Sequence, residues 1–334
     1  MKKVLVLGAG GAMGQYLVPQ LDKLGYEIYA VDLKENESDK KNIKWIQANV
    51  FEEGVLDELM KGGYDSVVDF MTYGADNFHE FAPKFLDNTD QYFYLSSCRV
   101  YANEEIPVKE TSPRILDVSK DEVLLNSRDY CIYKAKGENW LKESKYKNWT
   151  IVRPATTYSY MRYQLVTTEA ALNVGRAKEG KKVVLPIQAI DKPATLSWGG
   201  DVAEMISKLV FNEEALANDY IVSTSEHRTW KEIAEYYKDI CGLEVVWVDK
   251  EDYLWALNPE KPLRVRYQLE VARLYDRITD NSKILKATGM KQENLMPLYD
   301  GLKMEIEKLP KDFMWQGPVR EAIGKRMDEL IARL

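Results

Sequence analysis

Two Tyr-x-x-x-Lys pairs carry the clearest catalytic potential in the sequence, Tyr130 with Lys134 and Tyr299 with Lys303. On a helix this spacing places both side chains on one face, one turn apart. A phenol, whose ordinary pKa is about 10, can act as a base when a nearby ammonium stabilises its phenolate. Tyr130 follows an expected strand and the hydroxyl of Ser97, whereas Tyr299 lies far from any expected strand end. We therefore expect Tyr130 and Lys134 to be catalytic and Tyr299 to be structural.

A glycine-rich turn near the start of the chain is a candidate phosphate-binding site. Gly8, Gly11 and Gly14 follow an apolar run and precede a helical pattern. Glycine permits positive φ and a close approach of the backbone to a ligand, and a helix N-terminus attracts a pyrophosphate. The common GxGxxG fingerprint would need glycine in place of Met13, so the evidence is the position between strand and helix. The turn predicts a dinucleotide site formed by Gly8, Gly11, Ala12, Met13 and Gly14.

Asp32 ends the second expected strand, where an acid can select the dinucleotide. A carboxylate at this place accepts hydrogen bonds from the hydroxyls of the adenosine ribose and repels a 2′-phosphate. Asp32 therefore favours NAD over NADP, and Lys34 slightly weakens that preference. The alternative is a solvated carboxylate in an ordinary turn.

Short apolar runs that alternate with helical patterns must position these residues. Their near-continuous hydrophobicity is typical of strands buried on both faces of a parallel sheet. We expect strands at Lys3–Leu7, Glu27–Val31, Ile43–Ile46, Ser66–Met71, Tyr92–Leu95, Thr150–Val152 and Asp219–Val222, and helices at Met13–Leu24 (with Pro19 inside), Leu56–Lys61, Phe78–Leu86, Thr167–Lys178, Asp201–Val210, Trp230–Ile240 and Arg320–Leu334.

This alternation predicts an α/β fold, a Rossmann-type doubly wound parallel sheet with a smaller α/β substrate-binding lobe. We expect residues 1–155 to form the NAD-binding domain, with a later return of the chain near 195–225. Residues 156–334 should form mainly the substrate-binding lobe.

Composition limits the other classes of function. The chain has 334 residues and a net charge of -7, which argues against nucleic acid and anionic membranes as partners. Three cysteines without a CxxC pair and two histidines argue against a metal site. No run is apolar enough for a membrane span, and the apolar run after Lys3 is too short for a signal peptide. We expect a cytoplasmic protein without a metal.

Taken in their order along the chain, the motifs resemble those of the NAD-dependent epimerase/dehydratase family of extended short-chain dehydrogenases. The resemblance rests on the glycine turn, Asp32, the segment Tyr92–Tyr101, the Tyr130/Lys134 pair and Ile151–Pro154. It continues through Trp198–Ala203 and Leu274–Gly289, so it covers nearly the whole chain. It implies that NAD is the cofactor and that a nucleotide-activated sugar is the substrate.

The resemblance also implies roles for single residues. Tyr130 would remove the proton from a sugar hydroxyl, Lys134 would hold the nicotinamide ribose, and Ser97 would hydrogen-bond the reacting oxygen, with Ser96 as its nearest competitor. The remaining cofactor contacts would be Leu33, Asn49, Val50, Phe70, Met71 and Pro154.

The sequence departs from the family pattern at the substrate side. Cys98 and Arg99 occupy slots where 4,6-dehydratases carry acids, which disfavours dehydration. Thr156 stands where many relatives have an asparagine that touches the substrate diphosphate, and we retain it as a substrate contact. Arginines suit a diphosphate because they bind it bidentately. The candidates are Arg162, Arg176, Arg264, Arg266, Arg273 and Arg277, with Arg266 and Arg273 in the region where relatives bind the nucleotide.

Three functions remain open at this point. The first is a nucleotide-sugar 4-epimerase that works through a keto intermediate and recycles bound NAD. The second is an NAD(P)H-dependent keto-sugar reductase or dehydrogenase that exchanges its cofactor. The third, a non-catalytic relative that binds NAD or RNA, is disfavoured by the catalytic residues and the net charge. The family further implies a homodimer through the helix after Tyr130, where Trp140 and Leu141 could serve either that interface or the internal core.

Overall fold

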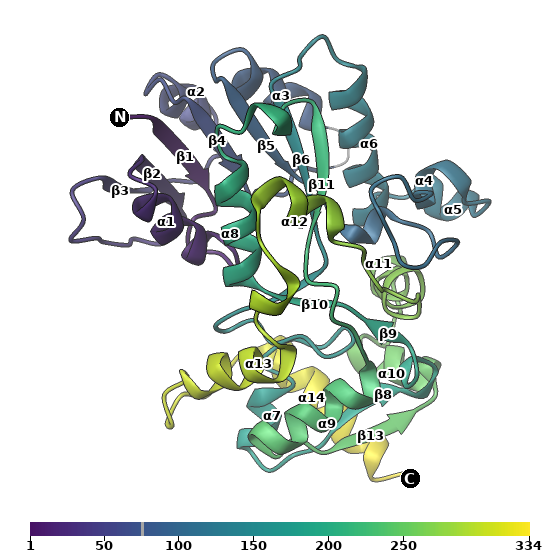
Figure 1. Ribbon diagram of the computed structural model, residues 1–334. Coiled ribbons are helices and arrows are strands. Elements are labelled where there is room, and N and C mark those ends of the chain that lie inside the picture. The colour runs from purple at the N-terminus through teal and green to yellow at the C-terminus, as the bar shows by residue number, and fades with distance from the viewer. Residues whose placement is uncertain (75–76) are drawn as a thin grey trace.

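The computed structural model describes residues 1–74 and 77–334, and a seven-stranded parallel sheet lies at its centre (Figure 1). The strand order is β11-β6-β5-β4-β1-β2-β3. The bounds are β1 (Lys3–Leu7), β2 (Glu27–Asp32), β3 (Ile43–Gln47), β4 (Ser66–Asp69), β5 (Gln91–Leu95), β6 (Trp149–Pro154) and β11 (Asn218–Val222). The predicted Rossmann-type sheet is confirmed.

The order of the strands places the candidate site. β1 pairs with β2 on one side and with β4 on the other, so the chain changes direction across the sheet at this point. In an open parallel sheet, ligands bind in the crevice outside the carboxyl ends of the strands where the order reverses. β4 ends at Asp69, two residues before the predicted end, so Phe70 and Met71 lie on the loop at this edge.

Helices cover both faces of the sheet, as the near-continuous burial of its strands requires. One face packs against α1 (Gly14–Lys23), α8 (Gly199–Leu209) and α12 (Ser282–Thr288), and the other against α2 (Val55–Met60), α3 (Phe78–Leu86) and α6 (Tyr130–Glu143). Helix α1 continues through Pro19. Because α8, β11 and α12 come from late in the chain, the C-terminal half contributes to this core as well.

A second lobe with its own apolar core lies below the sheet in the view of Figure 1 and contains the C-terminus. Its helices are α7 (Val174–Lys178), α9 (Trp230–Cys241), α10 (Lys250–Leu257), α13 (Leu298–Glu307) and α14 (Pro318–Ile331). Its strands pair as β8 (Val183–Pro186) with β13 (Val245–Val248), β9 (Pro193–Ala194) with β12 (Arg228–Thr229), and β7 (Thr156–Tyr158) with β10 (Leu196–Trp198).

The remaining helices are short. They are η1 (Cys98–Val100), α4 (Ile115–Val118), α5 (Glu122–Leu125), η2 (Ile187–Ala189), η3 (Glu213–Ala215), α11 (Leu263–Gln268), η4 (Leu269–Arg273) and η5 (Gln292–Asn294). Within the described ranges, no helix has the length and apolar character that crossing a membrane demands.

The helix predicted at Thr167–Lys178 is wrong for its first half, since α7 covers only Val174–Lys178. The side chain of Thr168 donates a hydrogen bond to the carbonyl of Leu165 (2.6 Å). The amide of Asn173 donates to two backbone carbonyls of the same loop. Such side-chain bonds compete with helical backbone bonds, and the segment therefore forms tight turns.

Candidate functional site

The glycine turn after β1 is as tight as the sequence predicted. Gly8 has φ +74°, a region that side chains other than glycine rarely adopt. A Cβ on Gly14 would lie 2.5 Å from the carbonyl oxygen of Gly8, so α1 packs directly on the turn. Met13, the N-cap of α1, makes no side-chain capping bond. The turn and the uncapped helix start together fit a pyrophosphate.

Gly10 belongs to this turn, although the sequence analysis did not assign it a role. Its backbone N–H donates to Oδ2 of Asp32 (2.9 Å), and a Cβ at Gly10 would stand 3.0 Å from the same oxygen. Asp32 also accepts a bond from the N–H of Lys34 (3.2 Å). The carboxylate is thereby fixed beside the turn and keeps free lone pairs for ribose hydroxyls. The signal for Gly10 was available in the Gly8-x-Gly10 spacing.

The other predicted cofactor contacts lie along the same edge. A Cβ on Gly8 would stand 3.4 Å from the Cβ of Phe70 and 3.6 Å from the Sδ of Met71, which places both residues against the turn. Asn49 follows β3 and accepts a bond from the N–H of Phe51 (3.2 Å). These placements bring the residues together, and their contact with a cofactor stays a prediction.

Four further residues complete the predicted set. Val50 is buried in the core on the α2–α3 side, and the backbone oxygen of Ala12 faces the start of α8 at Gly199. Leu33 is exposed beyond Asp32. Pro154 ends β6 and lines the cavity described below.

The start of α6 carries the candidate catalytic pair. Asp129 caps the helix by accepting a bond from the N–H of Cys131 (3.0 Å), so Tyr130 stands at the first helical position. Lys134 is buried one turn later, and its Nζ donates to the carbonyl of Leu95 at the end of β5 (2.6 Å). This Nζ lies 5.7 Å from the centre of the Tyr130 ring.

Ser97, and not Ser96, faces the cavity beside Tyr130. Ser97 caps the short helix η1, accepting a bond from the N–H of Arg99 (3.2 Å), and its hydroxyl acts on the phenol of Tyr130 by lowering its pKa. The hydroxyl of Ser96 points away and donates to the buried carboxylate of Glu138. The structure therefore brings Ser97, Tyr130 and Lys134 together.

Burial and charge shift the pKa values of this group. Burial raises the pKa of Tyr130, against the opposing effect of the nearby Arg162 and Arg99 guanidinium groups and the Ser97 hydroxyl. Burial lowers the pKa of Lys134 to about 8, although Asp69 and Glu138 favour its charged form. Arg162 and Arg99 are thus additional positive charges that act on the Tyr130 phenol, and the sequence had not linked them to Tyr130.

These residues open into a cavity of about 290 Å³ between the sheet edge and the second lobe. Its size is at the lower end for a ligand site. Met13, Ser97, Tyr130 and Pro154 line one side. The rest of the wall comes largely from later parts of the chain, including Thr156, Arg162, Gln164, Glu169, Thr195, Trp230, Arg273, Tyr275 and Arg277.

The predicted substrate residues divide into two groups. Thr156 and Arg273 line the cavity, which agrees with the expectation for their place. Arg266 is not among the lining residues, and its guanidinium pairs with Glu251 (2.8 Å) and Glu270 (3.0 Å) on the surface. These two carboxylates already pair with the guanidinium of Arg266 at the exposed face of α11, so the structure does not bring this side chain to the site.

Of the other arginine candidates, Arg176 is buried and hydrogen-bonds Asp328 together with two backbone carbonyls, so it supports the second lobe. Arg264 is exposed and lies outside the cavity wall. Tyr299 of the second Tyr-x-x-x-Lys pair donates to Asp239 and packs against Tyr236, away from the cavity.

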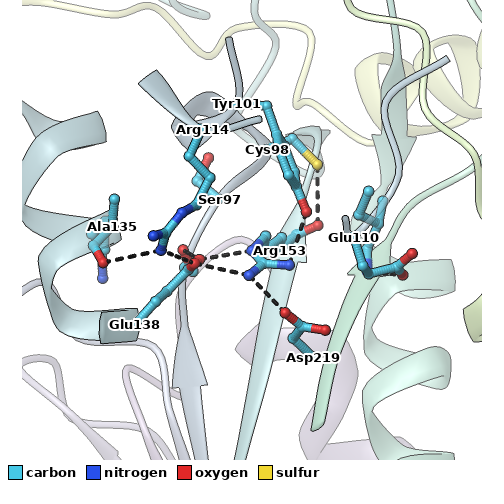
Figure 2. A network of polar contacts seen from close by, with 12 residues as sticks. Ser97, Cys98, Tyr101, Glu110, Arg114, Ala135, Glu138, Arg153 and Asp219 are labelled. Carbon is cyan, nitrogen blue, oxygen red and sulfur yellow. Dashed lines mark hydrogen bonds and ion pairs between the residues drawn. The ribbon is translucent and has the colours of Figure 1, made fainter. Parts of the chain in front are cut away.

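A buried network of charges lies behind α6 and was not expected from the sequence. Figure 2 shows Arg153 of β6 between the carboxylates of Glu138 and Asp219. Its Nε and Nη2 contact the two oxygens of Glu138 at 2.7 and 2.8 Å, and Arg114 reaches the same carboxylate at 3.1 Å. Burial alone would raise the pKa of Glu138, but the charge of Arg153 keeps it below its usual value.

The network joins the three elements that hold the site. Glu138 lies on α6 one turn after Lys134, Ser96 directly follows β5 and precedes Ser97, and Arg153 precedes Pro154 on β6. A charged residue in the otherwise apolar run of β6 was the signal that could have indicated a buried ion pair.

Comparisons with known proteins agree with this architecture. Residues 4–84 match the model of the NAD dependent epimerase/dehydratase family. A curated relative, the spore coat polysaccharide biosynthesis protein SpsK of Bacillus subtilis (strain 168), is 26% identical over 275 residues, which cover 76% of this chain and 85% of SpsK. The predicted resemblance to this family is confirmed.

Solved structures share the fold at low sequence identity. A UDP-glucose 4-epimerase of Thermus thermophilus in complex with NAD gives a TM-score of 0.64 at 17% identity, over 91% of this chain and 98% of that one. A UDP-glucuronic acid 4-epimerase of Bacillus cereus in complex with UDP-glucuronic acid and NAD gives 0.67 at 15% identity, with the same coverage. Likeness at this identity establishes the fold.

The buried amine of Lys134 should make stability depend on pH. Its pKa is about 8 in the folded chain and 10.5 ordinarily, so below pH 8 both states hold the proton and folding bears the full cost of burying the charge. Between pH 8 and 10.5 the folded state loses the proton first and the cost disappears. In urea unfolding, the free energy of unfolding of the wild type should rise by about 3 kcal/mol relative to that of Lys134→Met over this range. Lys136→Met, at an exposed position of α6, is the control. Parallel pH curves for wild type and Lys134→Met would contradict the assignment.

Removing one partner of the ion pair in Figure 2 should strongly destabilise the fold. Glu138→Gln leaves the guanidinium of Arg153 buried without its bidentate carboxylate. We expect a loss of about 3 kcal/mol in the free energy of unfolding, measured by urea denaturation. Glu143→Gln, at an exposed position of the same helix, should change stability by less than about 0.5 kcal/mol. Equal effects of the two substitutions would show that the buried pair has no special weight.

Proposed function

We propose that this chain is an NAD-dependent nucleotide-sugar epimerase that acts at C4 through a keto sugar and keeps its NAD between turnovers. The observation that carries the proposal is the meeting of Ser97, Tyr130 and Lys134 at the carboxyl end of β5, beside the glycine turn and open to one cavity. This is the arrangement that proton removal next to a bound dinucleotide requires.

The comparisons support an enzyme that uses NAD. The matched family consists of NAD-dependent epimerases and dehydratases, and both solved relatives contain NAD. The chain's own residues fit that cofactor. The turn at Gly8 and Gly14 admits a pyrophosphate, and Asp32, fixed by the N–H of Gly10, would receive the adenosine ribose and repel a 2′-phosphate.

Three residues of the chain would each have a separate role in the oxidation of the sugar hydroxyl. Bound NAD would supply the hydride acceptor. Tyr130 removes the hydroxyl proton as a phenolate, which the positive charges of Arg162 and Arg99 stabilise. Ser97 donates a hydrogen bond to the reacting oxygen. Lys134, anchored on the carbonyl of Leu95, holds its ammonium beneath the phenol.

The side of the site that follows Ser97 favours epimerisation over dehydration. A 4,6-dehydration needs a base at C5, and Cys98 and Arg99 occupy the positions next to Ser97. Burial raises the pKa of the Cys98 thiol to about 12, and its Sγ donates to the carbonyl of Arg153. Cys98 therefore packs as a small apolar residue and removes no proton near neutral pH.

The predictions of a homodimer and of a cytoplasmic location stay predictions. Leu141 is buried in the core of its own chain, and Trp140 contacts Phe78 and Tyr146. These two side chains therefore serve the internal packing of α6.

The cofactor content of the purified protein tests whether NAD is recycled. The chain should be purified without added cofactor and denatured, and the released dinucleotide identified by mass spectrometry. We expect about one NAD per chain, since an epimerase returns the hydride to the same sugar. An empty protein that binds NADPH more tightly than NADH would instead support a keto-sugar reductase and refute the role of Asp32.

Replacing the phenol tests the catalytic assignment. Tyr130→Phe should lower kcat for epimerisation by about 10²- to 10⁴-fold, because the base is lost, and should leave the amount of bound NAD unchanged. Tyr299→Phe is the matched control from the second Tyr-x-x-x-Lys pair and should keep wild-type kcat. A Tyr130→Phe enzyme with full activity would exclude Tyr130 as the base.

A further inference from the structure

The cavity beside Tyr130 has an unusual excess of positive charge. Four arginines line it, Arg99, Arg162, Arg273 and Arg277, and Glu169 is the one acid in its wall within the described ranges. Guanidinium groups placed together repel one another, and removing them from water is costly unless an anion compensates. The wall therefore points to a ligand that brings negative charge.

Among the described residues, no carboxylate pairs with either of the two arginines from the C-terminal half. Arg273 donates to the carbonyl of Val166 (2.8 Å), and Arg277 donates to the carbonyl of Tyr101 (2.7 Å). Burial and the neighbouring guanidinium groups lower the pKa of each to about 10. Both remain protonated at neutral pH, so the cavity keeps their full charge.

The other two arginines share the cavity wall with the Tyr130 phenol. The guanidinium carbon of Arg99 lies 5.8 Å from the centre of the Tyr130 ring, and Arg162 lines the same cavity, where its charge lowers the pKa of this phenol. Arg99 uses one terminal nitrogen for Asp129 (2.9 Å to each oxygen), and its Nε is buried without a hydrogen-bond partner. Arg162 is exposed, and no hydrogen bond or ion pair of its guanidinium is found among residues 1–74 and 77–334.

A second unsatisfied group lies in the same wall. The side chain of Thr195, between β9 and β10, is only 2% exposed, and its hydroxyl has no partner among the described residues. A buried hydroxyl without a partner costs free energy, and a polar ligand can remove that cost. Thr195 and the Nε of Arg99 thus both offer hydrogen bonds to a ligand in the cavity.

The position of the charge decides which part of the substrate it meets. In a nucleotide-sugar the diphosphate is attached to the anomeric carbon, on the far side of the ring from C4. A group that contacts Arg99 and Arg162 while the C4 hydroxyl contacts Tyr130 must instead be attached next to C4. We propose that the sugar is a hexuronate, whose C5 carboxylate is bound by Arg99 and Arg162. The inference rests on the proposed function and names its substrate class.

Matched nucleotide-sugars test this inference. UDP-glucuronate carries a carboxylate on C5 where UDP-glucose carries a hydroxymethyl group. The corresponding dTDP sugars form a second pair. The NAD-containing protein should be incubated with each, and formation of the 4-epimer followed by chromatography. We expect kcat/KM to favour the uronate of a pair by about 10- to 100-fold, the range of a charge-assisted contact.

Substitutions separate the carboxylate contact from folding. Arg162→Gln removes an exposed side chain without partners in the described part of the chain and should reduce the preference for the uronate to near one. Arg99→Lys keeps a charge for Asp129 but loses the planar donor set, and should raise KM for the uronate more than for the neutral sugar. Arg264→Gln, exposed and outside the cavity, should leave the preference unchanged.

The outcomes separate this inference from the proposed function. Epimerisation of the neutral sugars as fast as the uronates, or an unchanged preference in Arg162→Gln, would overturn the hexuronate assignment alone. It would show that the arginines bind the diphosphate. Failure of every sugar in both pairs to react would overturn the proposed function and the hexuronate assignment together.

Discussion

The ion pair between Arg153 and Glu138 is the interaction on which the candidate site depends. Both side chains are completely buried, and they join β6 to α6 behind the cavity. Ser96 adds the end of β5 to the same carboxylate. A buried pair of this kind is a weak source of net stability, but breaking it leaves an uncompensated charge, so its geometry is strictly held. The positions of Ser97 and Tyr130 follow from that geometry.

This constraint explains how a lysine can be kept inside the molecule. Lys134 lies between Tyr130 and Glu138 on α6, and its amine is tied to the carbonyl of Leu95. The carboxylates of Asp69 and Glu138 offset part of the desolvation cost of its charge. The carboxylates of Asp69 and Glu138 thus support the charge of Lys134, whose Nζ lies 5.7 Å from the centre of the Tyr130 ring.

The parts of the molecule that could be predicted from the sequence are those with a local signal. Buried parallel strands, the glycine turn and the Tyr130/Lys134 pair each depend on neighbours within a few residues, and the structure places them as expected. The early half of Thr167–Lys178 failed because its hydroxyl and amide side chains bond the backbone of their own loop. Arg266 failed for a related reason, since nothing in its local sequence distinguishes a surface ion pair with Glu251 from a ligand contact.

The cavity wall could not be predicted, because it gathers residues from segments that are distant along the chain. Arg99 comes from η1 after β5, Arg162 from the loop after β7, and Arg273 and Arg277 from the segment after α11. Because these segments are far apart in the sequence, no local pattern indicates that their arginines repel one another. An anion in the cavity would relieve that repulsion between the sheet edge and the second lobe at once. A negatively charged substrate would therefore favour the present arrangement of the two lobes, because it would offset part of the charge of the four arginines.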